Sequence, residues 1–585
     1  MTERAFSTFR RWPIGSTWRS AALSATMLAA LVAPAVAAAE GAPASAAGAY
    51  LAANFAQDRN DAEAASRYLA IALDDDPGNV DLLYRAFTSA VIGGDMAAAV
   101  DLAGRLEENF PADPLSTVML ALDDVEAGRY DEAADRLESI ERDGIASFLL
   151  PMLLGWVNAA LDDEAAAMAE LDLLAGENGF GALASLHRGL ILDMNGDLEG
   201  ARLAFEASFG LGHTLRLVEA AGSLYERLGE TDRARSLYQQ YAEENVDSTM
   251  VEPLLARIES GVTPSALITD PKSGIAEVLF HIATALNQEG AADIALLQTQ
   301  FALYLQPDFP LAQVLLADIL IGRGRNDEAL AIYQAVDRRS AVSWTARLSV
   351  VTALDRLERR DEAIELLSTM AEERLDRSGP LVRLGDLLRG EERYDEAIVA
   401  YDAALERSPQ LDDADWSFLY RHGIALERGK QWQRAEQALI RAIDLNPDHA
   451  HLLNYLGYSW IDRGENLDEG EELIRRAIDL SPQDGYIVDS LGWAYFRTGR
   501  IEEAVEELER AVELRSEDTV INDHLGDAYW LAGRRTEARY QWRRALRTVD
   551  DDEMALAIED KLANGFSDAG PVDGPQTAED ASGAQ

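Results

Sequence analysis

The seven histidines are the residues of this sequence that could most directly bind a metal ion. They are His187, His213, His281, His422, His449, His451 and His524. A zinc site needs several ligands at characteristic spacings, and no second ligand cluster accompanies these histidines; His449 and His451, in "PDHAH", form only a pair. The sequence also has no glycine-rich phosphate loop and no nucleophile elbow. It therefore predicts no metal site, no cofactor site and no catalytic residue, and we expect a protein that is not an enzyme.

Aromatic and carboxylate residues form a second set, and their chemistry suits recognition of another chain. In four segments, residues spaced i, i+4 and i+7 would share one face of a helix. The four triplets are Tyr420, Ile424 and Glu427; Asn454, Tyr458 and Ile461; Asp489, Trp493 and Phe496; and Asp523, Asp527 and Trp530. Aromatic anchors beside acidic groups would fit a partner segment with apolar and basic side chains.

The helices that must carry these triplets recur at a fixed interval. One small residue marks each of fourteen units: Ala65, Ala99, Ala133, Ala167, Ala201, Ala234, Ala295, Ala329, Ala363, Ala397, Ala435, Gly470, Ala504 and Ala538. Most successive intervals are 34 residues. A period of this size, with helical patterning inside each unit, predicts a helix-turn-helix solenoid.

Glycines and prolines explain how each unit is built. A glycine twelve residues before the marker, as in Gly492 and Gly526, would let the two helices of a unit pack closely. Glycines before the second helix, such as Gly128 and Gly499, suit a left-handed turn, and prolines such as Pro482 end that helix before the next unit. No strand-length run alternates at period two. We therefore expect an all-α fold.

The motifs "YLGYSW...LIRRAIDLSP" and "LGWAYFRTGRIEEAVEELERAVEL" resemble the tetratricopeptide repeat (TPR) family, from about Tyr50 to Leu546. The resemblance implies a right-handed superhelix, an α-solenoid of about fourteen repeats. In that family the face of the triplets lines a concave groove that binds peptides or protein segments. The implied groove residues are Tyr420, Ile424, Asn454, Tyr458, Asp489, Trp493, Phe496, Asp523, Asp527 and Trp530. The alternative is that Trp493, Phe496 and Trp530 pack between adjacent repeats.

One interval is 61 residues, which is one repeat plus 27. The surplus segment contains three prolines and two glycines, which favour an irregular connection. We expect an N-terminal array over 38–246, a hinge or capping insertion over 247–274 and a C-terminal array over 275–548. A short helix and a disordered acidic tail would occupy 549–585.

Residues 1–37 have the layout of a secretory signal peptide: arginines, an Ala-rich apolar stretch and a small-x-small end at Ala35 to Ala37. We expect cleavage near Ala37 and a periplasmic location. A retained membrane anchor is the alternative, although the stretch is broken by Pro34 and shorter than the ~20 residues that a span needs. The chain has no cysteine, so neither a lipid anchor on cysteine nor a disulfide is expected.

The chain is strongly acidic, with 52 basic and 103 acidic residues and a net charge of −51. Such a charge repels nucleic acid and anionic lipid head groups and favours basic partners. An acidic surface can equally be a means of staying soluble or an adaptation to a saline habitat. We predict protein or peptide partners and no nucleic acid.

The whole layout also resembles the long proteobacterial envelope TPR adaptors of the LbcA type, in early repeats such as "AASRYLAIALDDDPGN" and the closing "HLGDAYWLAGRRTEARYQWRRAL". Studied members are outer-membrane lipoproteins that present cell-wall hydrolases to a carboxyl-terminal processing protease. The resemblance implies a periplasmic protease and its substrates as partners, although this chain lacks the lipid-bearing cysteine. The alternatives are a scaffold for envelope or polysaccharide assembly and export, and an enzyme with a cryptic site.

Overall fold

The computed structural model describes residues 45–111, 113–175, 180–245, 248–408 and 415–566. These residues form thirty α-helices and one 3-10 turn, η1 (Phe209–Leu211), and no strand occurs among them. The expected all-α solenoid of TPR hairpins is therefore confirmed. The predicted signal peptide, 1–37, and the end of the predicted tail, 567–585, lie outside the described residues.

The helices divide between two compact units, with the boundary in the chain between Ala363 and Ile364. The N-terminal unit holds α1 (Ala46–Asp58), α2 (Ala62–Leu73), α3 (Val80–Gly93), α4 (Met96–Asn109), α5 (Pro114–Glu126), α6 (Tyr130–Glu138), α7 (Ala146–Ala160), α8 (Glu164–Asp172), α9 (Phe180–Met194), α10 (Leu198–Ser208), α11 (Leu215–Arg227), α12 (Thr231–Glu244), α13 (Glu252–Ser260), α14 (Pro271–Gln288), α15 (Ala292–Leu305), α16 (Pro310–Gly322), α17 (Asn326–Ala335) and α18 (Ser343–Arg356). Helix α19 (Arg360–Glu373) spans the boundary.

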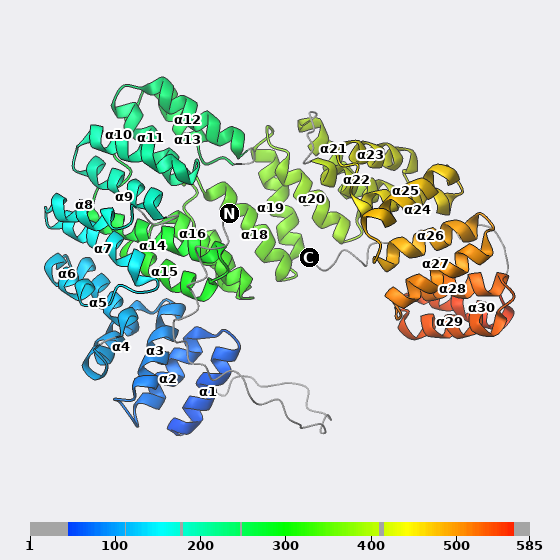
Figure 1. The fold of residues 1–585 in the computed structure, drawn as a ribbon, viewed down its shortest axis with the longest axis horizontal. Coiled ribbons are helices and arrows are strands. Elements are labelled where there is room, and N and C mark those ends of the chain that lie inside the picture. Colours follow the sequence, from blue (N-terminus) through cyan, green and yellow to red (C-terminus); the bar gives the residue numbers. More distant parts are fainter. Residues whose placement is uncertain (1–44, 112, 176–179, 246–247, 409–414, 567–585) are drawn as a thin grey trace. The chain divides into compact units, whose positions relative to one another are not determined.

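The C-terminal unit continues with the same hairpin. Its helices are α20 (Gly379–Gly390), α21 (Tyr394–Arg407), α22 (Trp416–Arg428), α23 (Trp432–Leu445), α24 (Ala450–Arg463), α25 (Leu467–Leu480), α26 (Gly485–Arg497), α27 (Ile501–Leu514), α28 (Thr519–Leu531), α29 (Arg535–Thr548) and α30 (Asp552–Asn564). Figure 1 shows these helices in order from yellow-green to red.

The fourteen marker residues all lie on the second helix of a hairpin, and all are buried. The glycines twelve residues earlier make the expected close contact: a Cβ atom on Gly526 would come within 2.4 Å of the Trp542 indole, and one on Gly492 within 2.6 Å of Leu508. Gly128 and Gly499 adopt φ of 74° and 79° in the turns between helices. The spacing in the sequence thus reflects the packing inside each hairpin.

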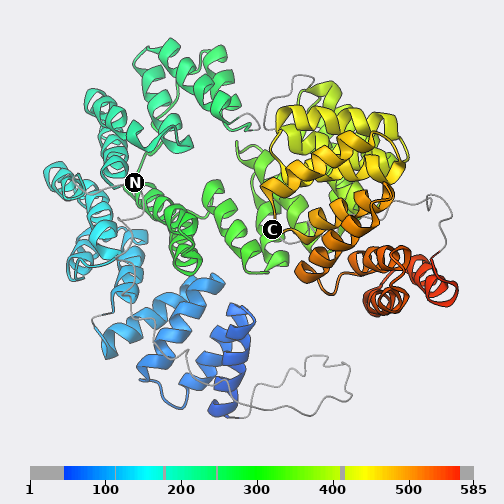
Figure 2. The ribbon, with the colours of Figure 1, turned by 45° about the vertical axis from the view of Figure 1, so that its right-hand side comes forward.

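The long interval has a different role from the one expected. Residues 247–274 contain helix α13, and the boundary between the compact units lies about ninety residues further on, between Ala363 and Ile364. After the insertion the chain turns back on its own unit: α14 packs against α7 and α9, and α15 packs against α3 and α5. In Figures 1 and 2 the green α14 and α15 lie beside the blue-to-teal hairpins. The insertion therefore does not separate two arrays, because it lets the seventh hairpin fold onto the earlier ones.

Candidate protein-binding surfaces

We call the side of a unit formed by the first helices of its hairpins the inner face. In the C-terminal unit this face is formed by α20, α22, α24, α26 and α28, and it carries all the predicted groove residues. The structure places these residues at two depths. Ile424, Asn454, Asp489, Phe496, Asp523 and Asp527 are buried, whereas Tyr420, Tyr458, Trp493 and Trp530 are half-buried.

The aromatic residues of α26 belong to a stack that reaches across three helices. The Trp493 ring lies 4.0 Å from the His524 ring of α28 and 4.9 Å from Phe496, nearly parallel to both. Phe566, which follows α30, meets Phe496 edge-on at 5.7 Å. Packing between hairpins, the alternative raised for Trp493 and Phe496, is therefore part of what these side chains do. Trp493 nevertheless keeps part of its surface exposed.

The predicted carboxylates already have cationic partners inside the chain. Asp489 lies 3.0 Å from His524, and Lys561 of α30 lies 2.6 Å from Asp523 and 2.8 Å from Asp527. The Trp542 indole N–H also donates to Asp527 at 2.9 Å. These contacts differ from the expected role of the three aspartates as free acidic groups for a basic partner. The reason is that the next hairpin, or the last helix, supplies the compensating charge.

Burial shapes the ionisation of this cluster. Burial, followed by the neighbouring Asp523 carboxylate, raises the pKa of Asp527 to about 7. Burial alone would lower the pKa of His524, but Asp489, with help from Asp523 and Asp527, outweighs it and raises that pKa above its ordinary value. Sequence reasoning missed His524 and Lys561 as partners. The repeat period could have found them, because they lie 35 residues after Asp489 and 34 after Asp527.

In the N-terminal unit the inner face, formed by α3, α5, α7, α9 and α11, is covered by α14 and α15. Trp156 of α7 packs on Gly274 of α14, where a Cβ atom would come within 2.3 Å of the indole. The Trp156 N–H donates to His187 Nδ1 at 3.0 Å, and His187 Nε2 lies 3.2 Å from His281 Nδ1. Since Nδ1 of a neutral His187 is the acceptor, its Nε2 carries the proton and donates to His281.

His187 is buried and His281 is half-buried, and both are neutral because the charged form of each loses solvation. Burial lowers the pKa of His187 to about 3. Burial, then the neighbouring His187 and Arg216, lowers the pKa of His281 well below its ordinary value. One turn before His281, the buried Glu277 accepts from Arg216 of α11 at 3.2 Å. Helix α14 is thus tied to α7, α9 and α11 by a connected group of polar side chains.

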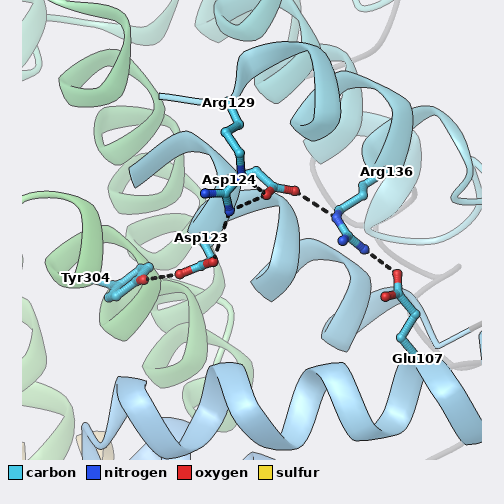
Figure 3. A network of polar contacts seen from close by, with 6 residues as sticks. All are labelled: Glu107, Asp123, Asp124, Arg129, Arg136 and Tyr304. Atoms are coloured by element: carbon cyan, nitrogen blue, oxygen red, sulfur yellow. Dashed lines mark hydrogen bonds and ion pairs between the residues drawn. The ribbon is translucent and has the colours of Figure 1, made fainter. Parts of the chain in front are cut away.

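Helix α15 is held in the same way on α3 and α5 (Figure 3). The Tyr304 hydroxyl donates to Asp123 of α5 at 2.9 Å across 181 positions of sequence. Asp123 also pairs with Arg129, which together with Arg136 binds Asp124. The Gln300 amide donates to the Ile92 carbonyl at 3.4 Å. We call the return of α14 and α15 onto the earlier hairpins the fold-back. These long-range hydrogen bonds hold its second helix, α15, in place.

A pocket of about 630 Å³ remains between α14 and the helices of the N-terminal inner face. Its lining is mostly apolar and includes Phe148, Phe180, Leu186, Leu215, Phe280 and Leu286. Arg216, at its margin, is paired with Glu219 and Glu277. Pockets of this size and character bind apolar ligands or side chains.

Two classes of site are not seen in the described part of the chain. No group of three or more histidine, aspartate or glutamate side chains there is placed to hold a metal ion. Among the helices of those residues, none combines the length and apolar character that crossing a membrane requires.

Comparison with known families identifies the hairpins. Models of the tetratricopeptide repeat match residues 220–248, 314–380, 351–412, 382–439, 420–485 and 489–518. The chain contains tetratricopeptide repeats. Proteins built from this repeat generally mediate protein–protein interactions, and no curated protein matches this sequence.

Solved structures of repeat proteins are similar over shorter or longer stretches. A MamA RS-1 double mutant is 26% identical over 30% of this chain and 96% of its own, with a TM-score of 0.27. A chain of the APC/C hetero-tetramer Cut9–Hcn1 is 16% identical over 90% of this chain and 97% of its own, with a TM-score of 0.35. The thermophilic TPR protein TTC0263 of Thermus thermophilus is 21% identical over 32% and 99%, with a TM-score of 0.28. With TM-scores this low, none of their functions is transferred to this chain.

Proposed function

We propose that this chain is an exported, non-enzymatic adaptor of the bacterial periplasm that binds segments of other proteins on the inner faces of its hairpins. In the narrower form of the proposal, it presents envelope or cell-wall hydrolases to a carboxyl-terminal processing protease. The general part is supported by the tetratricopeptide repeats. The location is supported by the signal-peptide pattern of residues 1–37, and the protease by the resemblance to envelope adaptors.

The observation that carries the binding role is an aromatic row on the inner face of the C-terminal unit. Tyr420, Tyr458, Trp493 and Trp530 come from four successive hairpins, and each is half-buried. Each is therefore held by its hairpin and still presents ring surface. Large aromatic side chains of this kind supply most of the binding energy at protein interfaces.

Unpaired polar atoms on the same face support the same role. Within the described residues, Trp493 Nε1 and Asn454 Oδ1 are buried and have no hydrogen-bond partner. Buried polar groups in native proteins are nearly always paired. A bound backbone could supply a carbonyl to the indole and an amide to the asparagine after a small side-chain movement.

The apolar pocket of the N-terminal unit offers a second contact. Its phenylalanine and leucine lining would accept apolar side chains of a bound segment, in the manner of peptide anchors in a groove. Because each unit has a surface of its own, one chain could hold two partners. This favours delivery of a substrate to an enzyme, and it is equally what a scaffold for envelope or polysaccharide assembly would need.

Affinity purification from envelope extracts with mass spectrometry distinguishes these two forms. A serine protease with a peptide-binding domain among the captured proteins supports the adaptor, whereas export or cell-wall synthesis machinery supports the scaffold. N-terminal sequencing of the mature protein should begin close to Ala38. An intact Met1 would contradict cleavage near Ala37 and would favour the retained membrane anchor.

The aromatic row is tested with Trp493→Ala on the partner so captured. We expect affinity to fall by about 2 kcal/mol, as hot-spot truncations do, with a smaller change in stability. Trp432→Ala is the matched control, because Trp432 is also half-buried but begins a second helix, α23. If Trp493 serves packing alone, its loss should cost ~3–5 kcal/mol of stability, and the melting temperature would fall together with binding.

A further inference from the structure

Helix α29 carries the opposite charge from the rest of the chain. Arg535, Arg539, Arg543 and Arg547 follow one another at intervals of four residues, and all four are exposed. We call them the arginine row. At a rise of 1.5 Å per residue, neighbouring members are separated by about 6 Å along the helix, and the row spans about 18 Å. It lies on a second helix, and although Arg535 and Arg539 border Trp530 of the aromatic row, its charge does not depend on the proposed function.

The arginine row has no acidic partner within the described residues. Arg534, next to it, pairs with Glu509 and Glu537, but no carboxylate lies within ion-pair distance of the four members of the row. Two of them, Arg535 and Arg539, lie over the Trp530 ring at 5.0 and 5.6 Å. In this chain of 103 acidic and 52 basic residues, other exposed arginines pair with carboxylates, as Arg359 and Arg434 do.

The simplest role for the arginine row is to make the exposed surface of the last hairpin polar, since the terminal repeat of an array needs a polar surface for solubility. That role requires polarity but not positive charge. The second helix of the neighbouring hairpin, α27, has a polar surface made by exposed glutamates, among them Glu502, Glu503, Glu506 and Glu513. Four arginines without an ion pair among the described residues have charge that a partner could neutralise.

The size of the row limits what that partner can be. A membrane surface or a nucleic acid is an extended polyanion, and it would bring its charge against the glutamates of α27 and the acidic residues that begin α30, such as Asp552 and Glu553. The net charge of −51 would oppose its approach as a whole. A single helix is narrow enough to contact α29 alone. Carboxylates at i and i+4 on such a helix are about 6 Å apart, which matches the row.

We propose that the arginine row of α29 is a docking site for an acidic helix of a partner protein, with carboxylates repeated every fourth residue facing the guanidinium groups. The exposed Tyr540, between Arg539 and Arg543 in sequence, adds an aromatic contact at the edge of the site. A guanidinium–carboxylate pair requires a defined geometry as well as opposite charges. The site therefore selects the spacing of the partner's carboxylates in addition to the sign of their charge.

The test uses the full chain and a synthetic helical peptide that bears glutamate at every fourth position, compared with the same peptide bearing glutamine. We expect the glutamate peptide to bind about tenfold more tightly at low salt and to lose affinity at physiological salt. The triple variant R535Q/R539Q/R543Q should weaken binding about tenfold. The melting temperature should stay unchanged, because the buried Ala538, Trp542 and Ala545 of α29 are untouched.

The control variant is R339Q/R359Q/R393Q, which removes the same charge from arginines that pair with neighbouring acids. It should leave peptide binding unchanged. Equal loss in both variants, or equal binding of the two peptides, would overturn the proposal. Tighter binding of phosphatidylglycerol vesicles or single-stranded DNA than of the peptide, abolished by the first variant, would also overturn it. So would self-association that the same variant removes, since the occupant would then be a second copy.

Discussion

In the N-terminal unit, helices α14 and α15 cover the inner face, and the contacts run through neutral histidines, a buried tryptophan and a tyrosine. In the C-terminal unit, the residues that reach the inner face from beyond the last hairpin include Lys561, Gly565 and Phe566, and the contacts of Lys561 there are charged. Both units use the same hairpin. The difference shows that a repeat array can use its binding face for its own chain when an insertion allows the chain to turn back.

The two faces also differ in what they leave open. In the N-terminal unit the fold-back leaves apolar pockets, one between α14 and the first helices and a smaller one beside α15. In the C-terminal unit the aromatic row runs over four hairpins, and only its last members, Trp493 and Trp530, belong to the hairpins that Lys561 and Phe566 reach. A partner of the first face must therefore be compact and apolar, whereas the second could bind an extended segment.

The largest expected effect comes from removing the central side chain of the fold-back. Trp156→Ala should lower the free energy of unfolding of the N-terminal unit by about 3–5 kcal/mol, because Trp156 is fully buried. The change also leaves His187 Nδ1 without its donor. Urea unfolding with separate probes in each unit measures the effect, and the C-terminal transition should not move. Trp344→Ala, at a half-buried position of α18, is the control. An equal loss there would show that α14 is not held by Trp156.

The sequence predicted the hairpins well because their signal is local. Each marker residue contacts a helix only about a dozen positions away, so the period of 34 residues records the packing directly. The fold-back could not be predicted in this way. It depends on contacts such as His187 with His281 and Asp123 with Tyr304, which lie 94 and 181 positions apart. The composition of the insertion predicted an irregular connection, but it does not indicate onto which helices the following hairpin packs.

For the candidate site, the sequence placed its residues on the first helices of the hairpins, and it did not predict the cations that pair with the aspartates. Residue types placed Asp489, Asp523 and Asp527 on one face, and that face is where they lie. The cationic side chains that pair with these aspartates come from the next hairpin or the last helix, whose positions follow from the repeat period. Applying the same period to His524 and Lys561 would have paired them. The half-buried aromatics remain predictions as binding residues, since exposure alone does not identify a partner.

The next largest effect should come from the charged end of the C-terminal unit. Lys561→Met leaves the buried carboxylates of Asp523 and Asp527 facing each other, and removing one partner of a buried pair costs about 3 kcal/mol. Amide hydrogen exchange should speed up in α28 and α30 and stay unchanged in the N-terminal unit. Lys430→Met, at an exposed turn of the same unit, is the control. Unchanged exchange in α28 would mean that the aspartates do not need Lys561.

His187 of the N-terminal unit and Asp527 of the C-terminal unit should contribute to stability in opposite directions between about pH 5 and 6.5, and in the C-terminal unit the contribution of Asp527 is opposed by buried His422, whose pKa burial lowers to about 4. His187 titrates at 6.5 when unfolded and at about 3 when folded, so the unfolded N-terminal unit binds the extra proton and stability falls as pH falls. Asp527 titrates near 3.8 when unfolded and at about 7 when folded, so the folded C-terminal unit keeps the proton and stability falls as pH rises. Each group contributes at most about 1.4 kcal/mol per pH unit.

Unfolding curves of the two units at several pH values test this contrast. Asp527→Asn should flatten the dependence of the C-terminal unit, because the amide oxygen can still accept from Trp542. His281→Gln should reduce the dependence of the N-terminal unit, whereas His213→Gln, outside the histidine network, should not. A pH dependence that neither Asp527→Asn nor His281→Gln changes would contradict the assignment of these groups.

The smallest energetic effect is expected from cutting the chain where it turns back. Residues 261–269 connect α13 to α14 without helix and are mostly exposed, which makes this part of the 247–274 segment the expected first site of limited proteolysis. If the insertion joined two independent arrays, the two pieces would separate after cleavage. The structure predicts that they stay together, because α14 and α15 remain bound to α3, α5, α7 and α9. Size-exclusion chromatography of the nicked protein under native conditions distinguishes the outcomes.

The same cut in the Trp156→Ala variant should release the pieces more readily, because the substitution weakens the packing that holds the two pieces together after cleavage. A first cut inside a hairpin would instead show that the insertion is better protected than its exposure indicates.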